Sequence, residues 1–264
     1  MERRGLSAVT NKVLLITGST GIAAASAELA ARAGAKVFIV SRTPDNARTL
    51  AERTGGAFTT GDLTDPGTAD AAVVACVKLH GRLDALFNVA GISGRAFGDG
   101  PLHECTEEGW DRTLDANAKS MFLMCRAALS QMTAQPVAPN GLRGTILNMA
   151  SVLGFSPQAQ HFATHAYAAT KGAIISMSLA MAAYYAPQKI RVNVIAPALV
   201  RTPMSARAQT NADVLEFIAH KQPLSGGMLE ADDVARAALF LLGEESRHMT
   251  GQVITVDGGW TVSG

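Results

Sequence analysis

The sequence is poor in cysteine: Cys76, Cys105 and Cys125 are spread widely over 264 residues. No C-x-x-C pair occurs, so neither a disulfide framework nor a zinc site is indicated, and no metal site is expected. Reduced thiols in the cytoplasm are the expected state. Cys76 and Cys125 lie in apolar, helix-like stretches and are predicted to be core residues.

Strong charge and long apolar runs are also missing. The formal net charge is +1, which excludes bulk electrostatic attraction to nucleic acid or to an anionic membrane. The apolar run at residues 13–16 is too short for a signal core or a membrane span. We therefore expect a cytoplasmic protein that binds neither nucleic acid nor a membrane.

The chain does contain ample material for one large core. Apolar residues make up 48% of the sequence and charged residues 17%, while aromatic residues are only 5%. Abundant alanine and glycine favour closely packed layers of helices and strands. Predicted strands at residues 13–16, 37–40, 58–61, 83–89, 145–149, 190–195 and 253–256 alternate with predicted helices at 23–33, 68–79, 106–132, 166–185 and 232–242.

This alternation predicts an α/β fold, namely a Rossmann-type doubly wound parallel β-sheet flanked by helices. No linker or repeat divides the chain, so residues 1–264 are expected to form a single domain. Residues 199–228 lack strand character and carry Pro203, Pro223, Gly226 and Gly227. This segment is either a mobile lid over a site or a packed surface excursion, and both interpretations stay open.

The first predicted strand runs directly into Thr17-Gly18-Ser19-Thr20-Gly21-Ile22, and a helix follows. Glycine lets the backbone turn sharply and approach a pyrophosphate, and the helix start offers free N–H groups and a positive dipole end. The spacing is G-x-x-G rather than G-x-G-x-x-G, so a plain tight turn is the competing interpretation.

The end of the second predicted strand carries Ser41-Arg42-Thr43, where a carboxylate would hold the ribose hydroxyl of NAD(H). Arg42 can pair with a 2′-phosphate, and Ser41 and Thr43 can donate hydrogen bonds. The pattern therefore favours NADP(H) over NAD(H), with NAD(H) still possible. The alternative is that Arg42 is a solvated surface residue.

Tyr167 and Lys171 lie four residues apart at the start of a predicted helix. This spacing puts both side chains on one helical face, so they can point into one pocket. An ammonium beside a phenol favours the phenolate, and we expect Lys171 to lower the pKa of Tyr167. Taken alone, the pair would more simply be read as an exposed helix face.

Further motifs accompany the pair in a fixed order. They are Thr17-Gly18, Asp62-Leu63, Asn88-Val89-Ala90-Gly91, Asn117, Ser151, Tyr167-x-x-x-Lys171 and Gly251-Gln252-Val253-Ile254-Thr255-Val256-Asp257-Gly258-Gly259. With them the chain resembles the short-chain dehydrogenase/reductase family over nearly its whole length. The resemblance implies a dinucleotide-binding oxidoreductase with a Ser-Tyr-Lys-Asn catalytic set.

By that resemblance each catalytic residue has a role. Tyr167 would be the general acid and base, Lys171 would lower its pKa and bind the nicotinamide ribose, and Ser151 would bond the substrate oxygen. Asn117 would help hold a water that relays protons to Lys171. The expected cofactor-binding residues are Gly18, Ser19, Thr20, Gly21, Ile22, Ser41, Arg42, Asp62, Leu63, Asn88, Ala90, Gly91, Tyr167, Lys171, Pro197, Val200 and Thr202.

Within that set, Asp62 and Leu63 would contact the adenine, and Val200 and Thr202 would contact the carboxamide. The chain departs from the family pattern at Ala24, Val89 and Ala198, and in a longer stretch between Ser151 and Tyr167. That stretch carries His161 and His165, which are either substrate contacts or, more simply, surface histidines. The residues expected to line a partly apolar substrate pocket are Leu153, Phe155, Phe162 and Met204.

The sequence thus predicts an NADP(H)-dependent carbonyl reductase or alcohol dehydrogenase acting on a small-molecule ketone or secondary alcohol. Two alternatives are a non-catalytic sensor of NADP(H) and a reductase of carbon–carbon double bonds. The family resemblance also implies a homo-oligomer, a dimer or a tetramer, assembled through the long central helices.

Overall fold

The computed structural model describes residues 9–264, and residues 1–8 of the predicted domain lie outside the described residues. A seven-stranded parallel sheet forms the centre, with the strand order β3-β2-β1-β4-β5-β6-β7. Its strands are β1 (Val13–Thr17), β2 (Lys36–Ser41), β3 (Ala57–Thr60), β4 (Ala85–Asn88), β5 (Gly144–Met149), β6 (Ile190–Pro197) and β7 (Val253–Val256). The predicted doubly wound sheet and each of its predicted strands are confirmed.

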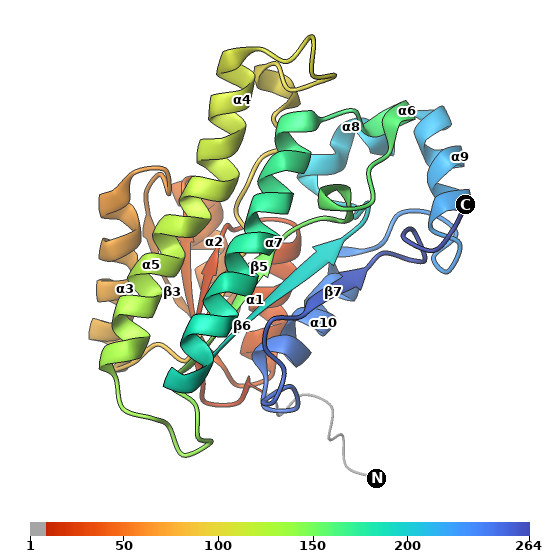
Figure 1. Cartoon of the computed structure of the whole chain (residues 1–264). Helices are drawn as coiled ribbons and strands as arrows, with labels where there is room; N and C mark the ends of the chain where they lie inside the picture. The colour runs from red at the N-terminus through yellow and green to blue at the C-terminus, as the bar shows by residue number, and fades with distance from the viewer. Residues whose placement is uncertain (1–8) are drawn as a thin grey trace.

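Helices cover both faces of the sheet, as Figure 1 shows. They are α1 (Ile22–Arg32), α2 (Pro44–Thr54), α3 (Pro66–His80), α4 (Glu107–Leu114), α5 (Ser120–Ala134), α6 (Ala159–Phe162), α7 (His165–Tyr185), α8 (Ala206–Gln209), α9 (Ala212–Lys221) and α10 (Ala231–Leu242). The apolar sides of α3, α5 and α7 pack on one face of the sheet. Those of α1, α2 and α10 pack on the other face.

The central strands are buried along their whole length because helices cover both of their faces. Cys76 and Cys125 lie in the core beside them, as predicted, and the described cysteines are free thiols. None of the helices within residues 9–264 combines the length and apolar character that a membrane span requires.

The predicted helix at residues 106–132 is present but interrupted. Thr106 caps its start by accepting a hydrogen bond from the backbone N–H of Gly109 at 2.9 Å. A π-helical turn at Asp115–Lys119 then separates α4 from α5. Such a bulge widens the helix by one residue in a turn and often marks a functional site. Here it contains Asn117.

Residues 199–228 form α8, α9 and a 3₁₀ turn at Pro203–Ser205, none of which the sequence pattern predicts. Val214 and Ile218 of α9 are buried against Trp260 in a small separate core. The segment is therefore packed onto the domain, and its inner side faces the cavity described below.

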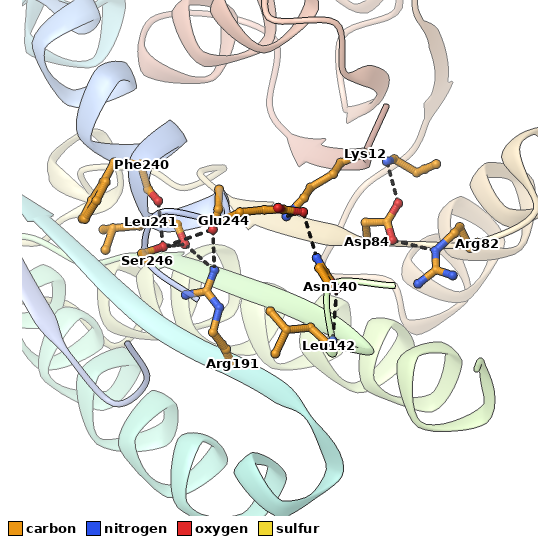
Figure 2. Close-up of polar contacts among 12 residues, drawn as sticks. Lys12, Arg82, Asp84, Asn140, Leu142, Arg191, Phe240, Leu241, Glu244 and Ser246 are labelled. Atoms are coloured by element: carbon orange, nitrogen blue, oxygen red, sulfur yellow. Dashed lines mark hydrogen bonds and ion pairs between the residues drawn. The ribbon is translucent and has the colours of Figure 1, made fainter. Parts of the chain in front are cut away.

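Polar contacts hold the amino ends of the strands, opposite that cavity (Figure 2). Arg191, near the start of β6, donates to the carbonyls of Leu241 and Gly243 at the end of α10. Lys12, just before β1, pairs with Glu244 at 3.7 Å. Arg191 thereby gives hydrogen-bond donors to carbonyls that the end of α10 leaves free, and both contacts lie away from the site.

Candidate active site

A cavity of about 800 Å³ opens at the carboxyl ends of the strands. It lies around β1 and β4, where the strand order reverses and the crevice of a doubly wound sheet is expected. Residues from the glycine turn, the end of β2, the end of β5, the start of α7 and the 199–228 segment line it together. Ligand binding at this edge is the usual use of such a crevice.

The glycine turn lines one end of the cavity. Gly18 and Gly21 have φ angles of 94° and 54°, a region that favours glycine. A Cβ on Gly21 would lie 3.0 Å from Thr202, so the turn and the 197–202 loop are in close contact. Among the described residues, no side chain caps the start of α1, and its first turn carries no acid. Its N–H groups are therefore available for an anion.

Thr17 supports this end of the site, and the sequence pattern does not single it out as a separate contributor. Its hydroxyl oxygen accepts hydrogen bonds from the backbone N–H groups of Val89 and Ala90, at 2.9 and 3.0 Å. The bonds join the ends of β1 and β4 and set the width of the crevice. A threonine at the last position of a strand gives no sequence signal for such a contact.

The end of β2 forms the next wall of the cavity. Ser41 and Ser19 share a hydrogen bond between hydroxyl groups at 2.8 Å. Arg42 and Asp62 both line the cavity, and no carboxylate lies at the end of β2 itself. Hydrogen bonds from Thr64 hold the pKa of the Asp62 carboxyl below its usual range, with a smaller contribution from Arg42. Leu63, which with Asp62 is expected to contact the adenine, lies in the same wall.

Tyr167 and Lys171 both line the cavity from the first turns of α7, as predicted. The Lys171 ammonium is 5.3 Å from the centre of the Tyr167 ring and donates to the carbonyl of Met149 at 3.0 Å. Lys171 is 4% exposed, and burial lowers its pKa to about 8. The two groups thus share one partly enclosed space.

The expected direction of the Tyr167 pKa is wrong for this structure. Burial raises the pKa of Tyr167 to about 12, while a hydrogen bond with Ser151 acts in the opposite direction. Burial prevails because the Lys171 ammonium is directed at a backbone carbonyl and its own charge is disfavoured by burial. The phenol is therefore protonated at neutral pH.

Ser151 follows β5 and lies in the cavity wall beside Tyr167. Its hydroxyl is 3.4 Å from the carbonyl oxygen of Pro197 and accepts from the N–H of Leu153 at 3.3 Å. Two hydroxyl groups from different elements, Ser151 and Tyr167, can therefore meet one ligand oxygen.

Two predicted residues lie behind the cavity wall. Asn117 is fully buried, and its side-chain amide bonds both the N–H and the C=O of Ile92, at 2.8 and 3.1 Å, and the hydroxyl of Thr170 at 3.3 Å. It thereby joins the loop after β4 to α7. Asn88 is also buried and bonds Asn148 at 2.9 Å beneath Ala90 and Gly91, which do line the cavity.

The loop at residues 197–202 closes the far side of the cavity. Pro197, Val200 and Thr202, which are expected to bind the cofactor, all line it. Val200 pairs with Leu229 in an isolated parallel β-bridge. This bridge ties the loop to the chain two residues before the start of α10. Thr202 lies against Gly21, so this loop covers the glycine turn.

Asp99 supports the site from outside the cavity wall, and the sequence pattern does not reveal it. It is 5% exposed, and its two carboxylate oxygens accept the backbone N–H groups of Ala166 and Tyr167, each at 2.9 Å. These are free N–H groups at the start of α7, so Asp99 caps the helix that carries Tyr167. The cap comes from another part of the chain, which is why local spacing gives no sign of it.

The substrate side of the cavity is partly apolar, as predicted. Leu153, Phe162 and Met204 line it, together with Trp260, whereas Phe155 is 47% exposed and does not. The expectation that Phe155 lines the pocket is wrong, because the chain turns at the 3₁₀ helix Val152–Gly154 and leaves this side chain exposed. The rings of His161 and His165 do not line the cavity either.

Comparison with known proteins agrees with this geometry. A family model described as enoyl-(acyl carrier protein) reductase matches residues 16–261. Momilactone A synthase from Oryza sativa subsp. japonica is 34% identical over 261 residues, covering 96% of this chain and 91% of the relative. The 2,5-dichloro-2,5-cyclohexadiene-1,4-diol dehydrogenase LinX of Sphingobium indicum is 34% identical over 260 residues, covering 96% and 98%.

A solved structure gives the same result. A short-chain type dehydrogenase/reductase from Mycobacterium ulcerans superposes with a TM-score of 0.87 at 30% sequence identity. The match covers 97% of this chain and 92% of that chain. The likeness therefore extends over the sheet, the helices and the cavity-lining loops alike.

Proposed function

This chain belongs to the short-chain dehydrogenase/reductase family, and from that premise we propose that it moves a hydride between NADP(H) and a secondary alcohol or its ketone. It is an oxidoreductase of CH–OH and C=O groups, with a nicotinamide dinucleotide as cofactor and a small molecule as substrate. The observation that carries the proposal is one cavity that is lined by the glycine turn and by Tyr167, Ser151 and Lys171.

The cavity wall fits a nicotinamide dinucleotide. The uncapped start of α1 and the two glycines with positive φ suit a pyrophosphate. Arg42 and Ser41, with no carboxylate at the end of β2, favour the 2′-phosphate of NADP(H) over the free hydroxyl of NAD(H). The bound dinucleotide supplies or takes up the hydride.

In the reducing direction, the protonated hydroxyl of Tyr167 gives its proton to the substrate oxygen as the carbonyl carbon becomes an alcohol carbon. Ser151 donates a second hydrogen bond to that oxygen and stabilises its developing charge. Lys171, held by the Met149 carbonyl, brings a positive charge close to the phenol. Asn117 acts through its bonds to Ile92 and Thr170, which fix the loop after β4 against α7.

The proposal is tested with NADPH and a panel of ketones, by following NADPH absorbance and identifying the alcohol formed. Tyr167→Phe removes the proton donor and should abolish turnover while NADPH binding remains. Tyr184→Phe is the matched control, because Tyr184 is on the same helix and 69% exposed. NADPH binding without turnover of any ketone would favour a non-catalytic sensor instead.

A second candidate is reduction of a carbon–carbon double bond, because the matching family model is described as an enoyl reductase. The same assay with enones separates the two activities. An allylic alcohol is the product expected from carbonyl reduction, and a saturated ketone is the product of double-bond reduction.

We also infer a homo-oligomer built through α5 and α7, since Phe122 and Leu179 on these helices are 46% and 42% exposed. Light scattering after gel filtration would measure a dimer or tetramer.

We place the protein in the cytoplasm on the strength of its free cysteines. Residues 199–228 are proposed as the substrate-side cover of the cavity.

A further inference from the structure

Two arginine side chains line the substrate side of the cavity and have no role in the chemistry proposed above. Arg95 lies in a short 3₁₀ turn after β4, and Arg207 lies on α8 in the 199–228 segment. Both donate to one oxygen, the backbone carbonyl of His161, at 3.0 and 3.4 Å. Two segments far apart in the sequence therefore bring their guanidinium groups together.

The protein offsets this pair of positive charges only in part. Within residues 9–264 neither guanidinium forms an ion pair. Burial lowers the pKa of Arg95, and the neighbouring charge of Arg207 lowers it further. Among the described residues, the acidic side chain in the cavity wall is Asp62, on the dinucleotide side.

The charge of Asp99 raises the pKa of Arg95 and so offsets part of this positive charge, but within residues 9–264 Asp99 forms no ion pair with either guanidinium. Its oxygens are occupied by the backbone N–H groups of Ala166 and Tyr167. A single neutral carbonyl, that of His161, is shared by the two guanidinium groups. Each guanidinium has five N–H donors, so most of them remain available to a ligand.

The arginines also lie at the end of the cavity where a substrate would bind. The charge of Asp99 acts on Arg95 and raises its pKa, and the same Asp99 caps the helix that carries Tyr167. His161, whose carbonyl they share, packs its ring 5.1 Å from the Phe217 ring, and Phe162 of the cavity wall packs 5.6 Å from Trp260. Arg42, in contrast, lies with Ser41 at the end of β2.

We propose that the substrate is an amphipathic oxyanion, in which Arg95 and Arg207 bind a carboxylate or similar head group while its carbonyl or alcohol carbon lies at Tyr167. The proposal rests on the proposed function and narrows it to oxo acids and their hydroxy acids. The planar guanidinium fork matches a carboxylate in two-point geometry, and sulfonate or phosphate oxygens share this chemistry. Phe162, Leu153 and Trp260 receive the apolar body.

The first experiment compares acids with their neutral esters. NADPH-dependent reduction of 2-, 3-, 4- and 5-oxohexanoate is measured beside that of the four methyl esters. One member of the acid series should exceed its ester in kcat/KM by about ten- to hundredfold, the range expected for a charged hydrogen bond. The best chain length reports the spacing between the arginines and Tyr167. Sulfonate and phosphate analogues of that length identify the preferred oxyanion.

Variants assign the preference to the two arginines. Arg95→Gln and Arg207→Gln should each lower kcat/KM for the acid about tenfold or more. Neither variant should change kcat/KM for the methyl ester. Arg95→Lys keeps the charge and should retain part of the preference. Arg236→Gln is the matched control, because Arg236 is an exposed arginine on α10 outside the cavity wall. It should leave the acid-to-ester ratio unchanged.

A binding measurement separates this proposal from the proposed function. The enzyme–NADPH complex is titrated with hexanoate and with hexanamide, and the affinities are measured by calorimetry with and without the arginine variants. Tighter binding of hexanoate that is lost in Arg95→Gln supports the anion site even if no ketone is reduced. Ketone reduction without any preference for acids in turnover or binding would overturn the anion site and leave the proposed function standing.

Discussion

Replacing Asp99 by asparagine tests whether a cap supplied from the loop after β4 positions Tyr167. Asparagine has the same shape, but its amide group keeps one accepting oxygen and turns an NH₂ toward the second backbone N–H. One charge-assisted hydrogen bond is lost, worth about 1.5–3 kcal/mol, and the helix start loses about 0.3–1 kcal/mol of dipole stabilisation. We expect the free energy of unfolding to fall by about 2–4 kcal/mol.

The loss should also reach the chemistry, because one of the two capped groups is the N–H of Tyr167 itself. A shift at the start of α7 should lower kcat by up to about a hundredfold and leave the Kd of NADPH unchanged. Urea denaturation at fixed protein concentration and steady-state kinetics measure the two effects. The control is Asp45→Asn, an exposed acid in the first turn of α2. If Asp99→Asn behaved like this control, the cap would not position Tyr167.

Three further predictions concern the cofactor, the proton and the packing of the site. Arg42→Ala should weaken NADPH binding far more than NADH binding, and equal losses in calorimetry would contradict a phosphate contact. Burial lowers the pKa of Lys171 to about 8, so its side chain is charged below that pH. The rate of carbonyl reduction should therefore fall as the pH rises through about 8. A rate that does not change up to pH 10 would contradict a role for the Lys171 charge. Gly91→Ala puts a Cβ 2.6 Å from the Asn117 side-chain oxygen and should lower the free energy of unfolding by about 1–3 kcal/mol. Gly100→Ala has open space around the new Cβ and should leave the free energy of unfolding unchanged.

Much of the fold was predictable because the central strands are buried on both faces. The apolar run that makes up most of β1 is typical of a strand covered on both sides, and the alternation of such runs with helical segments predicts a parallel sheet. Helix α2 was missed because it is largely polar, with Ala47, Leu50 and Ala51 as its buried residues. The short helices α8 and α9 were missed for a different reason. They pack on a separate small core around Trp260 rather than on the sheet.

The candidate site was predictable where its residues are neighbours in sequence. Tyr167 and Lys171 share a helical face, and Ser41 and Arg42 follow a strand, so local spacing was enough to place them. Asp99 was not predictable, since its contact with Tyr167 spans 68 positions. The Tyr167 pKa depends on burial and on the direction of the Lys171 side chain, and neither follows from spacing.

The most direct test of the hydride-transfer account uses NADPH that carries deuterium on both hydrogens at C4 of the nicotinamide ring. The wild-type enzyme should convert a ketone to an alcohol with deuterium on the carbinol carbon, as mass spectrometry would show. Tyr167→Phe should bind the same NADPH and form no alcohol. Alcohol without deuterium, or full alcohol formation by Tyr167→Phe, would contradict the account.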